Sequence, residues 1–166
     1  MDEELLSRQL PQSLEAEQAV LGSILIDSRC ITDVVGIVKP EDFYLQQNRE
    51  IFEAIYTMFN FSQTIDPVTV LDKLKELGYY HDNSRDYILQ LMEITPTAAN
   101  VVRYANIVRD KAMLRELNQA ATDIHEMVSE EVGTPAEMLE SAEKKIYALR
   151  KGERGDSLEH IGTTLH

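Results

Sequence analysis

The chain is poor in the residues that interrupt helices or cross-link a fold. Its 166 residues include seven glycines, five prolines, one cysteine and no tryptophan. A single cysteine, Cys30, excludes an internal disulfide. Basic side chains are also scarce, because 16 Lys and Arg face 29 Asp and Glu, for a net charge of −13 at pH 7. This acidic balance disfavours direct, tight binding to nucleic acid.

Long hydrophobic runs are missing as well. The longest uninterrupted apolar runs, such as residues 24–26, are far below the ~20 residues that a membrane span needs. The opening Met-Asp-Glu-Glu lacks the basic and apolar regions of a secretory signal. We therefore expect a soluble domain in the cytoplasm with no membrane contact, whose 43% hydrophobic residues suffice for a core.

Apolar residues recur at helical spacing almost everywhere, which predicts an all-α fold. Residues with helix-capping chemistry mark several of the expected ends. We expect a helix over 14–26 capped by Ser13, a short helix through Ile31, Val34, Val35 and Val38 that stops before Pro40, a third capped by Asn48, a fourth from the cap Asp66 to the stop Gly78, and a fifth reaching Leu91.

The second half of the chain predicts a long antiparallel helical hairpin. A helical pattern without Gly or Pro runs from Ala98 to Val132, and Gly133 ends it. Thr134-Pro135-Ala136-Glu137 then combines an N-cap, a proline at the first helical position and a capping-box glutamate. Apolar positions step by three and four along both helices, at Leu114, Leu117, Ala121, Ile124 and Val128, and at Leu139, Ala142, Ile146 and Leu149.

These elements predict three parts. Residues 1–94 form a compact helical head, residues 95–150 the hairpin, and residues 151–166 the start of a linker toward a larger missing part. The linker is inferred because residues 151–156 contain no apolar residue and two glycines.

No catalytic motif is present, so we expect no enzyme, no metal and no cofactor in this fragment. A nucleotide-binding phosphate loop needs a Gly-Lys pair, which is absent. His125-Glu126 opens like a zinc-protease motif, but Ser129 stands where the second histidine is required. Cys30 is expected to be a small core or surface residue and not a reactive thiol.

The apolar seams of the hairpin have two interpretations. They can be intramolecular core, which we favour for any single residue, or a surface for self-association. The apolar set Met113, Leu114, Ala120, Ala121, Met127 and Val128 spreads over more than one stripe, which favours a second contact. Tyr44, Tyr79, Tyr80 and Tyr87 are candidate anchors for a partner protein, although a half-buried packing position is the commoner role for any one tyrosine.

Several blocks of the sequence are similar to one family. Residues 10–25, LPQSLEAEQAVLGSIL, resemble the opening of the bacterial replicative DNA helicase of the DnaB type. Residues 40–44 (PEDFY), 48–52 (NREIF) and 95–101 (TPTAANV) resemble the same family in the same order. The resemblance covers nearly the whole chain and implies the N-terminal domain, with a helical head, a hairpin and the start of the linker to the motor.

The resemblance also implies an assembly and a process. In that family the N-terminal domains associate through hairpins as a trimer of dimers in a hexameric ring, which receives primase in DNA replication. The parent would be an ATP-dependent 5′–3′ DNA helicase, with ATP and Mg in the missing motor domain, and a helicase loader is a further partner that the sequence leaves open.

Site residues follow from the resemblance position by position. The family's primase surface corresponds to Tyr87, Asn118 and Ile124. The hairpin residues Leu114, Leu117, Ala121, Ile124, Leu139, Ala142 and Ile146 are the expected self-association set. Two alternatives stay open: a free-standing helical dimerisation or adaptor module, and the similarly folded helicase-binding domain of primase.

Overall fold

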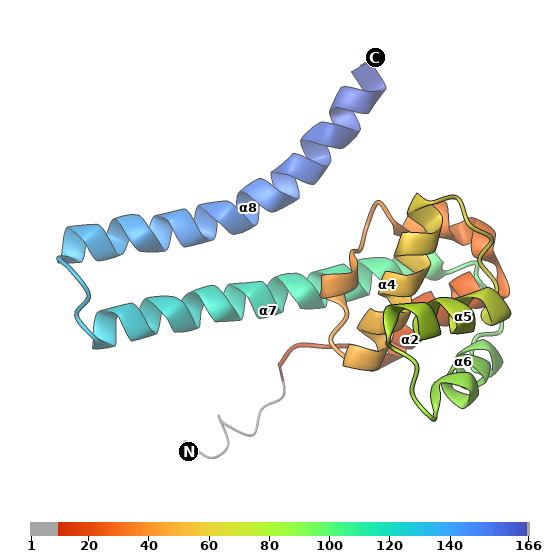
Figure 1. Ribbon diagram of the computed structural model, residues 1–166. Coiled ribbons are helices and arrows are strands. Elements are labelled where there is room, and N and C mark those ends of the chain that lie inside the picture. Colours follow the sequence, from red (N-terminus) through yellow and green to blue (C-terminus); the bar gives the residue numbers. More distant parts are fainter. Residues whose placement is uncertain (1–9, 166) are drawn as a thin grey trace. The chain divides into compact units, whose positions relative to one another are not determined.

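The computed structural model describes the backbone of residues 10–165 and the side chains of residues 10–150. This part of the chain is all helical, as predicted, and contains no strand. It forms two compact units that divide after Ala112, here called the first and the second unit. The helices of Figure 1 are α2 (Leu14–Ile26), α3 (Ile31–Val34), α4 (Gln46–Asn60), α5 (Pro67–Leu77), α6 (Ser84–Glu93), α7 (Val101–Ser129) and α8 (Pro135–Leu165), with 3-10 turns η1 (Ser28–Cys30) and η2 (Pro40–Asp42).

The helix ends follow the capping residues in three places. Ser13 Oγ accepts a hydrogen bond from the Ala16 N–H at 3.2 Å, and α2 has the predicted bounds. Both ends of α5 are also as predicted. At its start Asp66 Oδ1 accepts a hydrogen bond from the Thr69 N–H, and at its end Gly78 adopts the left-handed region at φ 77°. These caps satisfy backbone groups that the helix itself leaves unpaired.

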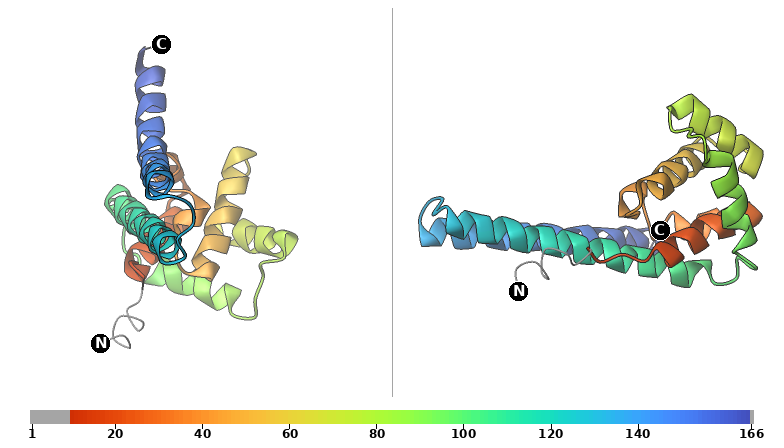
Figure 2. Two further views of the ribbon diagram at one scale, coloured as in Figure 1. Left: turned by 90° about the vertical axis from the view of Figure 1, so that its left-hand side faces the viewer. Right: turned by 90° about the horizontal axis from the view of Figure 1, so that it is seen from below.

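The short helices of the first unit pack around one core. Helix α2 contacts α4 and α6, and α5 contacts α4 and α6, as the views of Figure 2 show for the red-to-green part of the chain. The rings of Phe43 and Phe52 stack at the centre with centroids 4.7 Å apart. The largest fully buried apolar side chains are Phe43, Phe52, Leu21, Ile24, Ile51, Ile55, Leu74, Ile88 and Leu91.

A series of polar contacts fixes the segment between α5 and α6 to one face of α4. Tyr79 Oη donates to Glu53 Oε2 at 3.0 Å. His81 Nε2 lies 3.0 Å from Glu50 Oε1, and Asn83 Oδ1 accepts from the amide of Gln47 at 3.1 Å. Every second residue of the segment (79, 81 and 83) thus contacts every third residue of α4 (53, 50 and 47). These contacts orient the start of α6.

Two sequence predictions in the first unit are wrong in detail. The helix expected to reach Val38 ends at Val34, although Val38 is fully buried. Asn48 is not an N-cap, because α4 begins at Gln46 and Asn48 lies buried within its first turn. The acceptor at this helix start is supplied instead by Glu17, a residue of α2.

Helix α7 belongs to both units, which moves the expected boundary. Its first part carries the buried residues Val101, Ala105 and Val108 of the main core. The compact units divide after Ala112, whereas the sequence analysis places the end of the head at residue 94. Burial of the first turns of α7 in the head is the physical reason.

Helix α8 begins as predicted but does not end as predicted. Thr134 Oγ1 accepts from the Glu137 N–H at 3.2 Å, and Pro135 is the first helical residue. The helix then continues to Leu165 and so includes residues 151–156, which the sequence analysis assigns to the start of a linker. A glycine inside a helix costs only ~1 kcal/mol relative to alanine, which weakens a helix without ending it.

Candidate interaction surfaces

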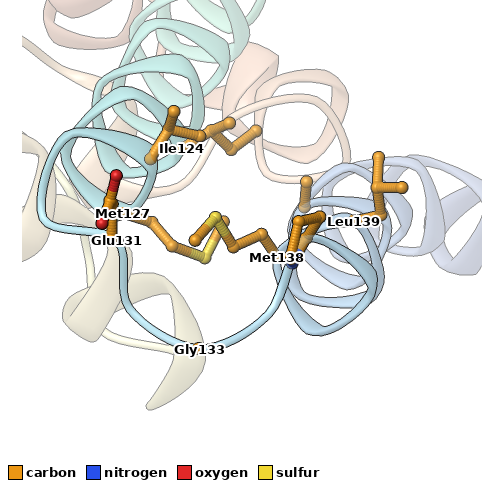
Figure 3. A pocket seen from close by; sticks show the side chains of 9 residues that line it. Ile124, Met127, Glu131, Gly133, Met138 and Leu139 are labelled. Atoms are coloured by element: carbon orange, nitrogen blue, oxygen red, sulfur yellow. The ribbon is translucent and has the colours of Figure 1, made fainter.

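The turn of the hairpin encloses an apolar hollow within the second unit. It has a volume of about 590 Å³ and lies between the end of α7 and the start of α8. Met127 and Met138 extend toward each other across it, and Glu131 stands at its edge (Figure 3). Its lining residues are Ile124, Met127, Val128, Glu131, Gly133, Pro135, Met138, Leu139 and Ala142.

Local conformation explains why the helices separate here. Gly133 adopts φ 87° and Glu131 φ 48°, so the chain leaves the helical path through left-handed residues. The capping of α8 by Thr134 then fixes where the second helix starts. The sequence predicts the turn but not the hollow; the only signal for the hollow is the pair Met127 and Met138, one on each side of the turn.

Two heptad-spaced stripes run along α7 in the second unit, and the structure distinguishes them. Met113, Ala120 and Met127 are half-buried or buried, with Ala120 only 7% exposed. The neighbouring stripe is open: Leu114 is 46% exposed and Val128 55% exposed. The side chains of the first stripe therefore pack inside the unit, and those of the second stripe stay exposed to solvent.

The expected seam residues divide between exposed positions and the lining of the hollow. Leu114, Leu117, Leu139 and Ile146 are all exposed, and Ala121 is exposed too. Ile124 and Ala142 are half-buried and line the hollow, as does Leu139. None of the seven is fully buried in the single chain, and three of them border the hollow between the two helices of the hairpin.

Tyr87 is a core residue and not an exposed anchor. It is 9% exposed, and its hydroxyl donates to Asn48 Oδ1 and accepts from Gln18 Nε2 at 3.4 Å. Burial is the main reason that the pKa of Tyr87 is raised. Its ring and hydroxyl are therefore engaged within the first unit, where the sequence analysis expected an accessible side chain.

The Tyr87 contacts extend to a buried carboxylate. Glu17 is 1% exposed. Its oxygens accept from the Tyr44 N–H at 2.9 Å, the Leu45 N–H at 3.3 Å and Asn48 Nδ2 at 3.1 Å. The carboxylate sits at the N-terminus of α4, where the helix dipole stabilises negative charge.

The other two predicted primase positions lie in the second unit. Asn118 is exposed on α7, and its carbonyl accepts from Thr122 Oγ1. Ile124 is half-buried and lines the hollow. Six residues along a helix place these side chains about 120° apart around its axis, so they face different directions.

Helices α2 and α6 approach each other closely at Gly22. A Cβ atom built there would lie 2.0 Å from Thr95 Oγ1 and 2.5 Å from the Leu91 carbonyl oxygen. Thr95 Oγ1 itself donates to Leu91 O at 2.8 Å. A smaller hollow of about 300 Å³ opens beside this crossing, lined by residues that include Glu15, Gln18, Ile94 and Tyr104.

The described His, Cys, Asp and Glu side chains are the candidates for metal binding. Among them no three His, Cys, Asp or Glu residues are placed to hold a metal ion. Burial, together with the charges of Asp27 and Asp33, raises the pKa of the Cys30 thiol to about 11. This thiol therefore stays protonated and unreactive near neutral pH. Of the helices described, none combines the length and apolar character of a membrane span.

Comparison with known proteins defines the class. Residues 9–110 match the model of the DnaB-like helicase N-terminal domain. The crystal structure of the N-terminal domain of DnaB helicase from Mycobacterium tuberculosis superposes with a TM-score of 0.78 and 35% sequence identity, covering 85% of this chain and 99% of that one. The chain belongs to the family of DnaB-like helicase N-terminal domains.

Curated relatives agree with this assignment. The replicative DNA helicase DnaB of Leifsonia xyli subsp. xyli is 35% identical over 140 residues, which is 84% of this chain and 31% of the relative. The DnaB of Geobacillus stearothermophilus is 33% identical over 165 residues, or 95% of this chain and 35% of the relative. The chain thus spans about a third of the length of these relatives.

Proposed function

We propose that this chain is the N-terminal oligomerisation and primase-docking domain of a hexameric replicative DNA helicase of the bacterial cytoplasm. Its membership in the helicase family supports the parent activity, which would be ATP-dependent unwinding by a motor domain that binds ATP and Mg. The domain itself assembles subunits as dimers of hairpins, three dimers to a ring, and receives primase. A helicase loader is a further candidate partner.

The open stripe on α7 is the observation that carries the assembly role. Leu114 and Leu117 remain nearly half exposed in the second unit, and Ile146 on α8 is 38% exposed. Ala121 belongs to the same open face. Apolar residues that recur along one face of a long helix indicate a contact with another helix. Pairing of two hairpins along this face would remove these side chains from water.

Replacement of Leu117 by glutamate should dissociate the oligomer without unfolding the chain. The side chain is 47% exposed in the single chain, so a charge there costs little in the monomer. Buried in a subunit interface, the same charge would weaken association by ~2 kcal/mol or more, roughly thirtyfold in dissociation constant. Sedimentation over a concentration series, with circular dichroism in parallel, measures both quantities.

Leu89 provides the matched control, since it is also a leucine 47% exposed on a helix, but in the first unit. Leu89→Glu should leave the oligomer mass unchanged. A wild-type chain that stays monomeric at tens of micromolar, or equal effects of the two variants, would contradict self-association through the α7 face.

Because Tyr87 is buried, the proposed docking of primase rests on Ile124 and Asn118. Ile124→Ala should weaken binding of the cognate primase C-terminal domain by about 1 to 3 kcal/mol, as truncation of an apolar anchor does. Asn118→Ala should have a smaller effect. Tyr87→Phe should leave affinity unchanged, because it removes only a hydroxyl buried in the first unit. Calorimetric titration of each variant, after confirming helicity and oligomer mass, provides the measurement.

Leu89→Ala serves as the control for surface truncation in this titration. Full affinity of the Ile124→Ala variant would place primase elsewhere on the domain. The alternative of a free-standing adaptor is tested at the gene: a reading frame that continues beyond residue 166 into a phosphate-loop domain excludes it.

A further inference from the structure

The smaller hollow, beside the crossing of α2 and α6, lies wholly within the first unit. Its volume of about 300 Å³ is at the lower end of the range for small-ligand pockets. Eight of its ten lining residues come from two blocks of the sequence, residues 10–25 and 95–101. These blocks contain none of the residues proposed for assembly or for primase docking, so the hollow is separate from both surfaces.

Two buried hydroxyl groups in the wall of this hollow are fixed as acceptors. Ser23 Oγ donates its proton to the Ala19 carbonyl at 2.6 Å, and Thr95 Oγ1 donates to the Leu91 carbonyl at 2.8 Å. Ser23 is 1% exposed and Thr95 is 8% exposed. Because a hydroxyl has one proton and two lone pairs, each of these oxygens can offer a ligand only lone pairs.

The other polar groups of the wall add further acceptors and one negative charge. The Gln18 side chain donates from Nε2 to the Tyr87 hydroxyl at 3.4 Å, which leaves Oε1 as its acceptor. Thr97 and Asn100 are exposed and can donate or accept. Glu15 is the one acidic residue of the lining, which includes no Lys or Arg. The wall therefore favours a positively charged ligand that is rich in donors.

The acceptors lie at two ends of the hollow. Glu15 and Ser23 both belong to α2 and are eight residues apart, or about 12 Å along the helix axis. Ile94 and Tyr104 supply apolar surface to the same hollow. This arrangement suits a ligand with a donor group at each end of an alkyl chain.

We propose that this hollow binds a free aliphatic diamine or polyamine. One ammonium group lies at the Glu15 carboxylate and another at the hydroxyl oxygens of Ser23 and Thr95. An ammonium group has three N–H donors and no acceptor, which matches this wall. The surrounding surface adds attraction, because residues 10–112 contain 15 Asp or Glu and nine Lys or Arg. A phosphate or carboxylate ligand would be repelled by the same charges.

Titration of the whole isotope-labelled chain with cadaverine, followed by backbone amide chemical shifts, tests the proposal. We expect binding of one cadaverine per chain with a dissociation constant of about 1 mM or lower. Pentanediol has the same chain length without charge, and glutarate has the opposite charge. Both should bind at least about tenfold more weakly. Sodium chloride at matched ionic strength controls for screening on an acidic protein.

Two variants locate the bound amine. Glu15→Gln should weaken cadaverine binding by about fivefold or more, because it removes the negative charge of the wall. Glu41→Gln is the matched control, since Glu41 is exposed in the same unit and the change in net charge is equal. Thr95→Val replaces the buried hydroxyl by a methyl group and should weaken binding by about threefold or more. Thermal unfolding followed by circular dichroism checks that each variant is folded.

The outcomes divide clearly. Shift changes that are confined to residues 15–23 and 94–104, and that weaken in Glu15→Gln, support the proposal. Equal binding of cadaverine and pentanediol, or equal effects of Glu15→Gln and Glu41→Gln, overturns it. Shift changes spread over the whole acidic surface would show non-specific attraction and also overturn it. Tighter binding of a short, capped peptide with a single arginine would assign the hollow to a side chain of another protein and reject a free amine.

Discussion

Glu17→Ala should destabilise the first unit by about 3 to 5 kcal/mol, a large fraction of the stability of a domain. The change removes the acceptor for the Tyr44 and Leu45 N–H groups and for the Asn48 side chain. Buried donors left without an acceptor lose their hydration without compensation. Urea unfolding followed by circular dichroism measures the loss as a lower transition midpoint.

Glu15→Ala is the matched control on the same helix. Glu15 is exposed, so its removal should change the free energy of unfolding by no more than about 0.5 kcal/mol. If Glu17→Ala also changes the free energy of unfolding by no more than about 0.5 kcal/mol, water replaces the carboxylate at the start of α4 and the prediction fails.

Gly22→Ala should have an effect of similar size for a steric reason. The added methyl group would lie 2.5 Å from the carbonyl oxygen of Leu91, as well as on Thr95 Oγ1. A backbone oxygen cannot turn aside as a side chain can, so α2 and α6 must separate. We expect a loss of about 2 to 4 kcal/mol, measured by thermal or urea unfolding.

Gly36 offers the control for this substitution, since a Cβ atom there meets nothing within 4 Å. Gly36→Ala should be neutral or slightly stabilising. Thr95→Ala combined with Gly22→Ala should restore only part of the stability, because the Leu91 carbonyl remains. Complete rescue, or equal effects at the two glycines, would reject close backbone approach as the cause.

The candidate surfaces were only partly predictable from the sequence. The periodic pattern correctly singled out Leu114, Leu117 and Ile146 as apolar residues of the hairpin, but it could not say that they stay exposed. Tyr87 was selected as an anchor, and the structure places it in the core. Tyrosines are common at both interfaces and half-buried positions, so residue type alone does not distinguish the two.

The sequence by itself determined the helices, several of their ends and the hairpin. Periodicity and caps such as Ser13, Asp66 and Thr134 act between neighbours along the chain, so local sequence suffices. Only the tertiary structure decided that Glu17 serves the start of α4, and that Ala120 rather than Ala121 turns inward on α7. These outcomes depend on how helices that are distant in the sequence pack against each other. Adjacent stripes of α7 are equally apolar, so the sequence does not determine which stripe turns inward.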